Sequence, residues 1–206
     1  MNRFIRCSHS HWNIVLGVFC AWVIVPSVKA DEIRRVVTTL DAGGKAIALF
    51  DTRVPLKAAG AGSRATSGAI LWSTEGSPAD PSVKTDMAAK VRGLATPKGG
   101  TVFRLVEYPP TTPEQDAQLP LDSMMKIAGD HAPSRGMSPR HPAMHRTRTV
   151  DYAVIMSGEI DMLLDDSVLH FKPGDVVIQQ ATNHAWVNHG KEPCRILFVL
   201  IDSKEP

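Results

Sequence analysis

Hydrophobic and polar positions alternate most regularly in the C-terminal third of the chain. Between residues 150 and 180, short runs of apolar, β-favouring residues are separated by turn residues such as Gly158 and Pro173-Gly174-Asp175. Two-residue periodicity interrupted by turn chemistry predicts strands rather than helices. The strands expected here are Val150–Ser157, Ile160–Leu164, Val168–Lys172, Val176–Gln180 and Arg195–Asp202. Short strands at this spacing predict a small closed or double-layered β-barrel.

The N-terminal half has fewer clear patterns. It predicts a β-hairpin and two further strands, joined by loops and one helical turn. The hairpin is expected at Ile33–Leu40 and Ala46–Phe50, the strands at Ala69–Ser73 and Thr101–Tyr108, loops at Leu56–Gly68 and Thr111–Pro142, and the helical turn at Met87–Val91. The second loop is rich in proline and leads directly to His145, so we expect it to form a lid over the barrel mouth or to be partly disordered.

Two motifs in the patterned region resemble those of the cupin family. The first cupin motif holds two histidines, a carboxylate and then a glycine, and His145, Asp151 and Gly158 resemble it. The second motif runs from a Pro-Gly turn to a histidine and an asparagine, and Pro173-Gly174-Asp175 with His184 and Asn188 resembles it. The family's second histidine falls on Thr147, and its glutamate is replaced by Asp151.

The resemblance implies an all-β fold, a cupin-like double-stranded β-helix or jelly-roll barrel of the RmlC-like type. We expect an N-terminal β extension and a long Pro-rich loop to be attached to it. The expected division is a signal peptide over residues 1–30, strands and loops that pack on or complete the barrel over residues 31–142, and the core barrel motifs over residues 143–206.

His145, Asp151 and His184 are the candidate metal ligands. Two histidines and one carboxylate suit Fe(II) in oxygen chemistry and also bind Zn, Mn or Ni. Residues 145 and 151 differ by an even number, so a regular strand turns both side chains to the same face. Thr147 shares that face, but a hydroxyl is a poor ligand for the metals that imidazole prefers. The alternative is therefore a metal-free pocket in which the two histidines form hydrogen bonds.

Four further residues are assigned to the ligand pocket. Thr147 lies between two of the candidate ligands, and Tyr152 and Trp186 offer an aromatic wall for a planar ligand. Trp186 and Asn188 share strand parity with His184, although Asn188 also suits a role in a turn. The catalytic residues themselves stay open.

The first thirty residues are typical of a secretory signal peptide. Arg3 and Arg6 precede an apolar run from Trp12 to Val25, and Val28-Lys29-Ala30 places small residues before a cleavage site ahead of Asp31. The run is shorter than the roughly 20 residues of a membrane-spanning helix, so an uncleaved anchor is the less favoured alternative. We expect a secreted or periplasmic protein that contacts a membrane only through an uncleaved leader.

Removal of the leader changes the charge balance. The leader holds three of the 23 Lys and Arg residues and no acids, which leaves 20 basic side chains against 21 acidic ones. No basic cluster with interleaved aromatic residues remains, so no nucleic-acid partner is expected. Cys194 becomes the single cysteine and is interpreted as a core residue. The apolar strand Ile196–Ile201 and the cupin resemblance favour a homodimer.

Two functions follow from these features. The first is an exported, divalent-metal-dependent cupin enzyme of the dioxygenase, decarboxylase, isomerase or dehydratase type, acting on a small organic molecule inside the barrel. The second is a cupin that binds a small ligand without metal and without catalysis. The departure of Thr147 from the motif keeps both open.

Overall fold

The computed structural model describes residues 32–59, 66–94, 96–120 and 140–204. The chain divides into two units, Met1–Ala30 and Asp31–Pro206, and the described residues all belong to the second. The predicted signal peptide and the middle of the Pro-rich loop therefore lie outside the described residues. None of the described helices is long and apolar enough to cross a membrane.

The described part of the chain is built almost entirely from strands. The strands are β1 (Glu32–Leu40), β2 (Ala46–Pro55), β3 (Lys57–Ala59), β4 (Thr66–Thr74), β5 (Thr101–Tyr108), β6 (Thr149–Ser157), β7 (Ile160–Leu163), β8 (Val168–Phe171), β9 (Val176–Gln180), β10 (Ala185–Val187) and β11 (Cys194–Asp202). The short helical pieces are the 3-10 helix η1 (Met87–Lys90) and the helix α1 (Pro113–Asp116). This content confirms the all-β prediction.

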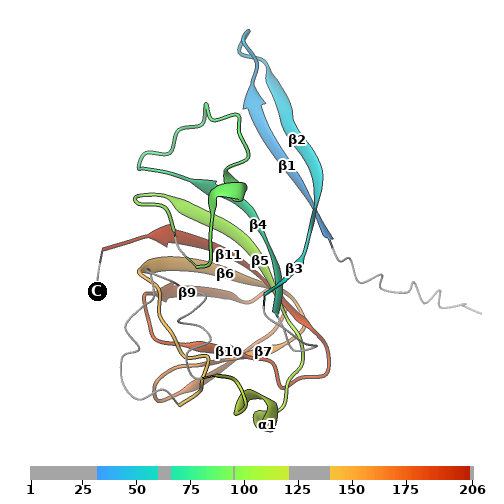
Figure 1. Ribbon diagram of the computed structural model, residues 1–206, viewed down its shortest axis with the longest axis vertical. Coiled ribbons are helices and arrows are strands. Elements are labelled where there is room, and N and C mark those ends of the chain that lie inside the picture. Colours follow the sequence, from blue (N-terminus) through green and yellow to red (C-terminus); the bar gives the residue numbers. More distant parts are fainter. Residues whose placement is uncertain (1–31, 60–65, 95, 121–139, 205–206) are drawn as a thin grey trace, which may run out of the picture. The chain divides into compact units, whose positions relative to one another are not determined.

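Two sheets form the barrel (Figure 1). The larger sheet has the strand order β3-β4-β5-β11-β6-β9, and the smaller sheet has the order β10-β7-β8. Apolar side chains from both sheets, including Ile155, Met162 and Ile196, form one buried cluster between them. Along β11, buried residues alternate with partly exposed ones, because successive side chains point to opposite faces of the sheet. The predicted jelly-roll barrel is confirmed.

The opposite face of the larger sheet carries a second, smaller core. Ala69, Leu71 and Leu105 are buried there, and side chains of the β1-β2 hairpin pack against them. Arg35 on β1 fixes the hairpin further, since its guanidinium donates to both carboxylate oxygens of Asp86, at 3.0 and 2.8 Å. Asp86 also caps the first turn of η1 by accepting from the backbone N–H of Ala88. Among the described residues, the N-terminal β extension thus contacts the barrel through the Arg35–Asp86 ion pair, a hydrogen bond from Arg35 to the carbonyl of Leu71 and a small apolar core.

Two sequence predictions need correction in this region. The segment Leu56–Gly68, predicted as a loop, contains β3 and the first residues of β4 among its described residues. The Pro-rich loop begins with α1, which has a capping box formed by Thr112 and Gln115. The small and polar residues of these segments show no strand or helix pattern, so neither element was predicted. Backbone pairing and capping override such weak local propensity. The division at residue 142 and the lid role of the loop stay predictions.

Gly158 has the conformation that its motif position requires. Its φ is +71°, a left-handed value that glycine adopts without a steric penalty. A Cβ atom at this position would also collide with the carbonyl oxygen of Pro193. The turn between β6 and β7 therefore packs directly against the start of β11.

Candidate functional site

His145 and His184 face each other across an isolated antiparallel bridge. The backbone N–H of each residue donates to the carbonyl of the other, at 2.9 and 2.8 Å. Both side chains are buried, and their ring centroids lie 4.5 Å apart at an interplanar angle of 44°. The backbone bridge therefore brings together two imidazoles that are 39 positions apart in the sequence.

Each ring is oriented by a backbone carbonyl two residues earlier. The Nδ1 atom of His145 lies 2.9 Å from the carbonyl oxygen of Ala143, and that of His184 lies 3.0 Å from the oxygen of Thr182. Because a carbonyl only accepts, Nδ1 carries the proton in both rings and Nε2 keeps its lone pair when the ring is neutral. The side-chain nitrogen Nε2 of Gln179 lies 3.0 Å from the same Nδ1 of His184, so a proton on Nδ1 requires the Gln179 amide to be turned with its oxygen toward the ring.

Burial keeps both imidazoles neutral. It lowers the pKa of His145, and it lowers the pKa of His184 to about 3, with a further contribution from the neighbouring His145. A hydrogen bond to a backbone carbonyl opposes the shift in each ring, but burial dominates. At neutral pH the site thus presents two hydrogen-bond acceptors rather than positive charges.

Asp151 is a buried carboxyl on β6. Its Oδ1 atom has no hydrogen-bond partner among the described residues. Burial raises its pKa to about 6, although a hydrogen bond from Thr149 and the positive charge of Arg104 act in the opposite direction. The hydroxyl groups of Thr147 and Thr149 lie 2.7 Å apart. Thr147 thus takes part in a hydrogen-bonded chain that ends at the carboxyl.

These groups line one cavity of about 120 Å³ inside the barrel, which we call the inner cavity. Its polar lining combines four of the predicted residues with one residue from β4 and two from β5, and its apolar lining comes mainly from β10 and β11. The lining residues are Thr66, Leu94, Arg104, Val106, Tyr108, His145, Thr147, Asp151, His184, Trp186, Phe198 and Leu200. The barrel therefore brings His145, Thr147, Asp151, His184 and Trp186 together.

The structure places two predicted pocket residues elsewhere. Tyr152 is 49% exposed and does not line the inner cavity, because it follows Asp151 on β6 and must point to the opposite face. Asn188 is buried, but its amide donates to the carbonyls of Tyr108 and Glu192 and its oxygen accepts from the N–H of Gly190. Asn188 therefore holds a turn, and both pocket assignments are corrected.

Sequence reasoning missed Arg104 and Tyr108. Both lie on β5 with the same parity as the buried Val102 and Val106, and this parity was the available signal. Burial raises the pKa of Tyr108, so its phenol stays protonated at physiological pH. Burial also lowers the pKa of Arg104, but an arginine remains charged at neutral pH. The inner cavity therefore contains one cation from β5 on the same face of the larger sheet as the carboxyl from β6.

The donor set fits a metal ion only in part. The free Nε2 lone pairs of His145 and His184 and the unpartnered oxygen of Asp151 are the atoms that a divalent metal would use. Among the described residues, however, no three His, Cys, Asp or Glu side chains are grouped closely enough to hold a metal ion. The three residues as metal ligands therefore stay a prediction. His141, four residues before His145, does not line the inner cavity, and its Nε2 atom lies 3.5 Å from Oδ2 of Asp116.

The chain is similar to one protein family, to several curated proteins and to several solved structures. A family model described as "Cupin domain" matches residues 131–200. Phomopsin biosynthesis cluster protein C' of Diaporthe leptostromiformis is 30% identical over 175 residues, which cover 83% of this chain and 79% of that protein. The cupin-domain-containing oxidoreductase srdD of Neurospora crassa is 29% identical over 143 residues, covering 66% of this chain and 58% of that protein. A solved structure of a Cupin 2 conserved barrel domain protein from Salinispora arenicola is 14% identical with a TM-score of 0.31, covering 50% of this chain and 63% of that one.

The raised pKa of Asp151 predicts a pH-dependent cost to stability. The pKa rises from 3.8 to about 6 on folding, so the folded state holds more protons between these values and the free energy of unfolding falls as pH rises. Asp151→Asn removes this term and should be more stable than the native protein by up to roughly 3 kcal/mol at pH 7, since one pKa unit corresponds to 1.36 kcal/mol. The difference should nearly vanish at pH 4. Urea unfolding at a series of pH values measures it.

The control is Asp166→Asn, which removes an exposed acid in the turn between β7 and β8. The buried histidines have lowered pKa values and give the opposite slope, but they are present in all three proteins and cancel in the comparison. A difference between the native protein and Asp151→Asn that does not change with pH would show that Asp151 titrates normally.

Proposed function

Because the chain belongs to the cupin family, we propose that its barrel binds a small organic molecule in the inner cavity. The lining of the inner cavity supports this proposal most directly. Trp186, Phe198 and Leu200 form an apolar wall. The polar atoms of His145, Asp151 and His184 lie beside it. An apolar pocket with a few convergent polar groups is the usual form of a small-molecule site.

Asp151 exchanges a proton with the bound molecule in this proposal. A carboxyl whose pKa is about 6 is present in both protonation states near neutral pH, which suits a general acid or base. The neutral imidazoles accept hydrogen bonds at Nε2 and orient hydroxyl groups of the ligand beside the carboxyl. The name of the Neurospora crassa relative, an oxidoreductase, supports an enzymatic reaction rather than binding alone.

A divalent metal ion, such as Fe, Mn, Zn or Ni, is the second candidate. The specific observation in its favour is the anchoring of both Nδ1 atoms to carbonyls, which fixes the tautomer that metal-ligating histidines need. His145 and His184 would hold the ion, with Asp151 as the third ligand. The ion would supply Lewis acidity or activation of oxygen to the bound molecule.

Export and dimerisation complete the proposal. Cleavage before Asp31 gives a secreted or periplasmic protein, and N-terminal sequencing of the exported chain tests this through its first residue.

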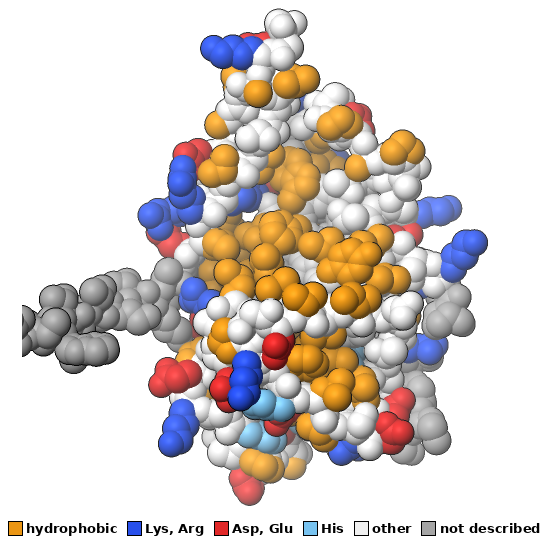
Figure 2. All heavy atoms as spheres, turned by 180° about the vertical axis from the view of Figure 1, so that it is seen from behind, with side chains coloured by type: hydrophobic (Ala, Val, Ile, Leu, Met, Phe, Trp, Pro, Cys, Tyr) orange, Lys and Arg blue, Asp and Glu red, His pale blue; other side chains and the backbone are white. Residues whose placement is uncertain are grey.

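A homodimer is supported by the apolar surface, which gathers over one face in Figure 2. Val176 and Ile178 on the edge strand β9 are each 58% exposed, and burial against a second copy would remove them from water.

Ligand binding should change the fluorescence of Trp186. The mature chain contains two tryptophans, Trp186 in the inner cavity and Trp72, which packs against Phe50 of the hairpin. A titration with a panel of small carboxylic acids, aldehydes and phenols should give a saturable change for at least one class of compound. The change should be lost in Trp186→Phe and kept in Trp72→Phe. A signal that survives in Trp186→Phe would place the ligand outside the barrel.

Metal content separates the two candidates. Plasma mass spectrometry on the mature chain, purified without a metal-binding tag, should find near-stoichiometric metal if His145, Asp151 and His184 are ligands. Asp151→Asn should then lower the content, since a neutral amide binds these metals more weakly than a carboxylate. Metal in Thr147→His but none in the native chain would contradict the metal candidate and leave the proton-transfer proposal in place.

A further inference from the structure

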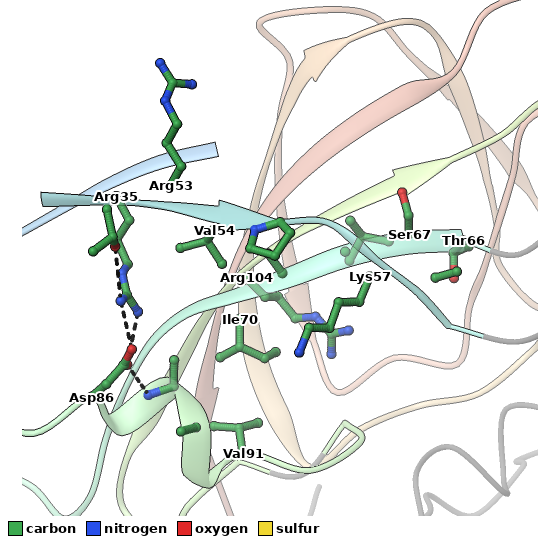
Figure 3. A pocket seen from close by; sticks show the side chains of 18 of the residues that line it. Arg35, Arg53, Val54, Lys57, Thr66, Ser67, Ile70, Asp86, Val91 and Arg104 are labelled. Atoms are coloured by element: carbon green, nitrogen blue, oxygen red, sulfur yellow. Dashed lines mark hydrogen bonds and ion pairs between the residues drawn. The ribbon is translucent and has the colours of Figure 1, made fainter. Parts of the chain in front are cut away.

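A second, larger cavity of about 870 Å³ adjoins the inner cavity, and we call it the outer cleft. It lies between the β1-β2 hairpin, β4, η1 and β5. Thr66, Arg104 and Val106 line both cavities, so the two spaces meet at these residues. Figure 3 shows the outer cleft with Arg104 and Lys57 among its labelled side chains.

The charged lining of the outer cleft is strongly unbalanced. Five of its lining residues are cationic and one, Asp86, is acidic; the cations are Arg35, Arg53, Lys57, Arg92 and Arg104. Asp86 is already bound by Arg35 through two hydrogen bonds. Arg53 forms an exposed ion pair with Glu32 at 3.2 Å. The remaining positive charge belongs to Lys57, Arg92 and Arg104.

Arg104 is the best placed of these three cations. Its Nε atom is buried and has no hydrogen-bond partner among the described residues, and its Nη1 atom makes only a long contact of 3.5 Å with the carbonyl of Gly93. Arg92 uses Nη1 to bind the carbonyls of Ala89 and Val91, which orients its guanidinium without neutralising it. In Figure 3 the side chains of Lys57 and Arg104 point into the same part of the cleft. Lys57, Arg92 and Arg104 form no ion pair among the described residues, although Arg104 also interacts electrostatically with Asp151, and three cations that line one cleft favour the binding of an anion.

The size of the inner cavity limits what it can hold alone. Its volume of about 120 Å³ is below that of a cavity known to take up benzene, roughly 150 Å³, and well below the 300 Å³ or more of typical ligand pockets. A ligand with more than a few heavy atoms therefore extends out of the inner cavity, and the outer cleft, which shares Thr66, Arg104 and Val106 with it, offers a route. The planar fork of a guanidinium matches the geometry of a carboxylate.

We propose that the outer cleft binds the carboxylate of a small organic acid, held by Arg104 with Lys57 and Arg92, while the rest of the acid, with the group that exchanges a proton with Asp151, occupies the inner cavity. This inference rests on the proposed function, because it uses the same inner cavity. The substrates are then organic anions. Residues of β3, β5 and the segment after η1 select them over neutral molecules. The hairpin, through Arg35 and Asp86, forms one wall of the site.

The test compares a carboxylate with its neutral counterpart. Calorimetric titration of the mature chain with hexanoate and with hexanamide at low salt should show at least tenfold tighter binding of hexanoate. Arg104→Gln should weaken hexanoate at least tenfold and weaken hexanamide much less, because only hexanoate loses an interaction between two charges. Arg34→Gln is the matched control, since Arg34 is exposed, pairs with Asp51 and does not line the cleft. If Arg104→Gln does not fold, the double variant Lys57→Gln with Arg92→Gln should give the same pattern.

Three results would overturn the inference. Equal affinity for hexanoate and hexanamide, with both lost in the cavity-filling variant Thr147→Leu, would contradict the anion site but keep ligand binding in the barrel. Inorganic phosphate that binds as tightly as hexanoate and is lost in Arg104→Gln would replace the organic acid by a free inorganic anion. Absence of binding by both hexanoate and hexanamide would count against the anion site and the ligand-binding proposal together.

Discussion

The pairing of β11 between β5 and β6 is the constraint on which the site depends. Phe198 on β11 lies opposite Arg104 on one side and opposite Ala153 on the other, and Leu200 lies opposite Asp151. This register turns the cation of β5 and the carboxyl of β6 to the same face of one sheet. A shift by one residue would turn the inward side chains of a strand outward, so the buried alternation of β11 also fixes the chemistry of the cavity.

The cavity contains polar groups that an apolar interior normally excludes. The backbone bridge and two carbonyls satisfy the histidines, and the hydroxyl groups of Thr147 and Thr149 support Asp151. Burial shifts His145, His184 and Asp151 toward their neutral forms, because the hydration free energy that a charged form loses exceeds the free energy that nearby groups return. The unpartnered oxygen of Asp151 and the unpartnered Nε of Arg104 are the groups that remain for a ligand. Pockets that keep such groups unsatisfied lose stability and gain the ability to bind.

The sequence predicted the barrel well, because alternation and turn residues report directly on strands. The strand Thr101–Tyr108 has the predicted bounds, and the motif residues His145, Thr147, Asp151, His184 and Trp186 line one cavity. Arg104 and Tyr108 were missed because only long-range pairing through β11 brings them to the site. Lys57 was missed because its short strand has no hydrophobic pattern. Tyr152 was misplaced although its parity relative to Asp151 already indicated the outer face.

Folding places two neutral imidazoles beside a carboxyl with a raised pKa. A pH titration of the mature chain by NMR, with carbon-13 at the Asp151 carboxyl and nitrogen-15 in the histidine rings, tests this directly. We expect a carboxyl midpoint near pH 6, an imidazole of His184 that is neutral at this pH, and a midpoint of His145 below its usual value, with the proton on Nδ1 in each neutral ring. A carboxyl midpoint near pH 4, or protonation of both rings above pH 6, would contradict this expectation.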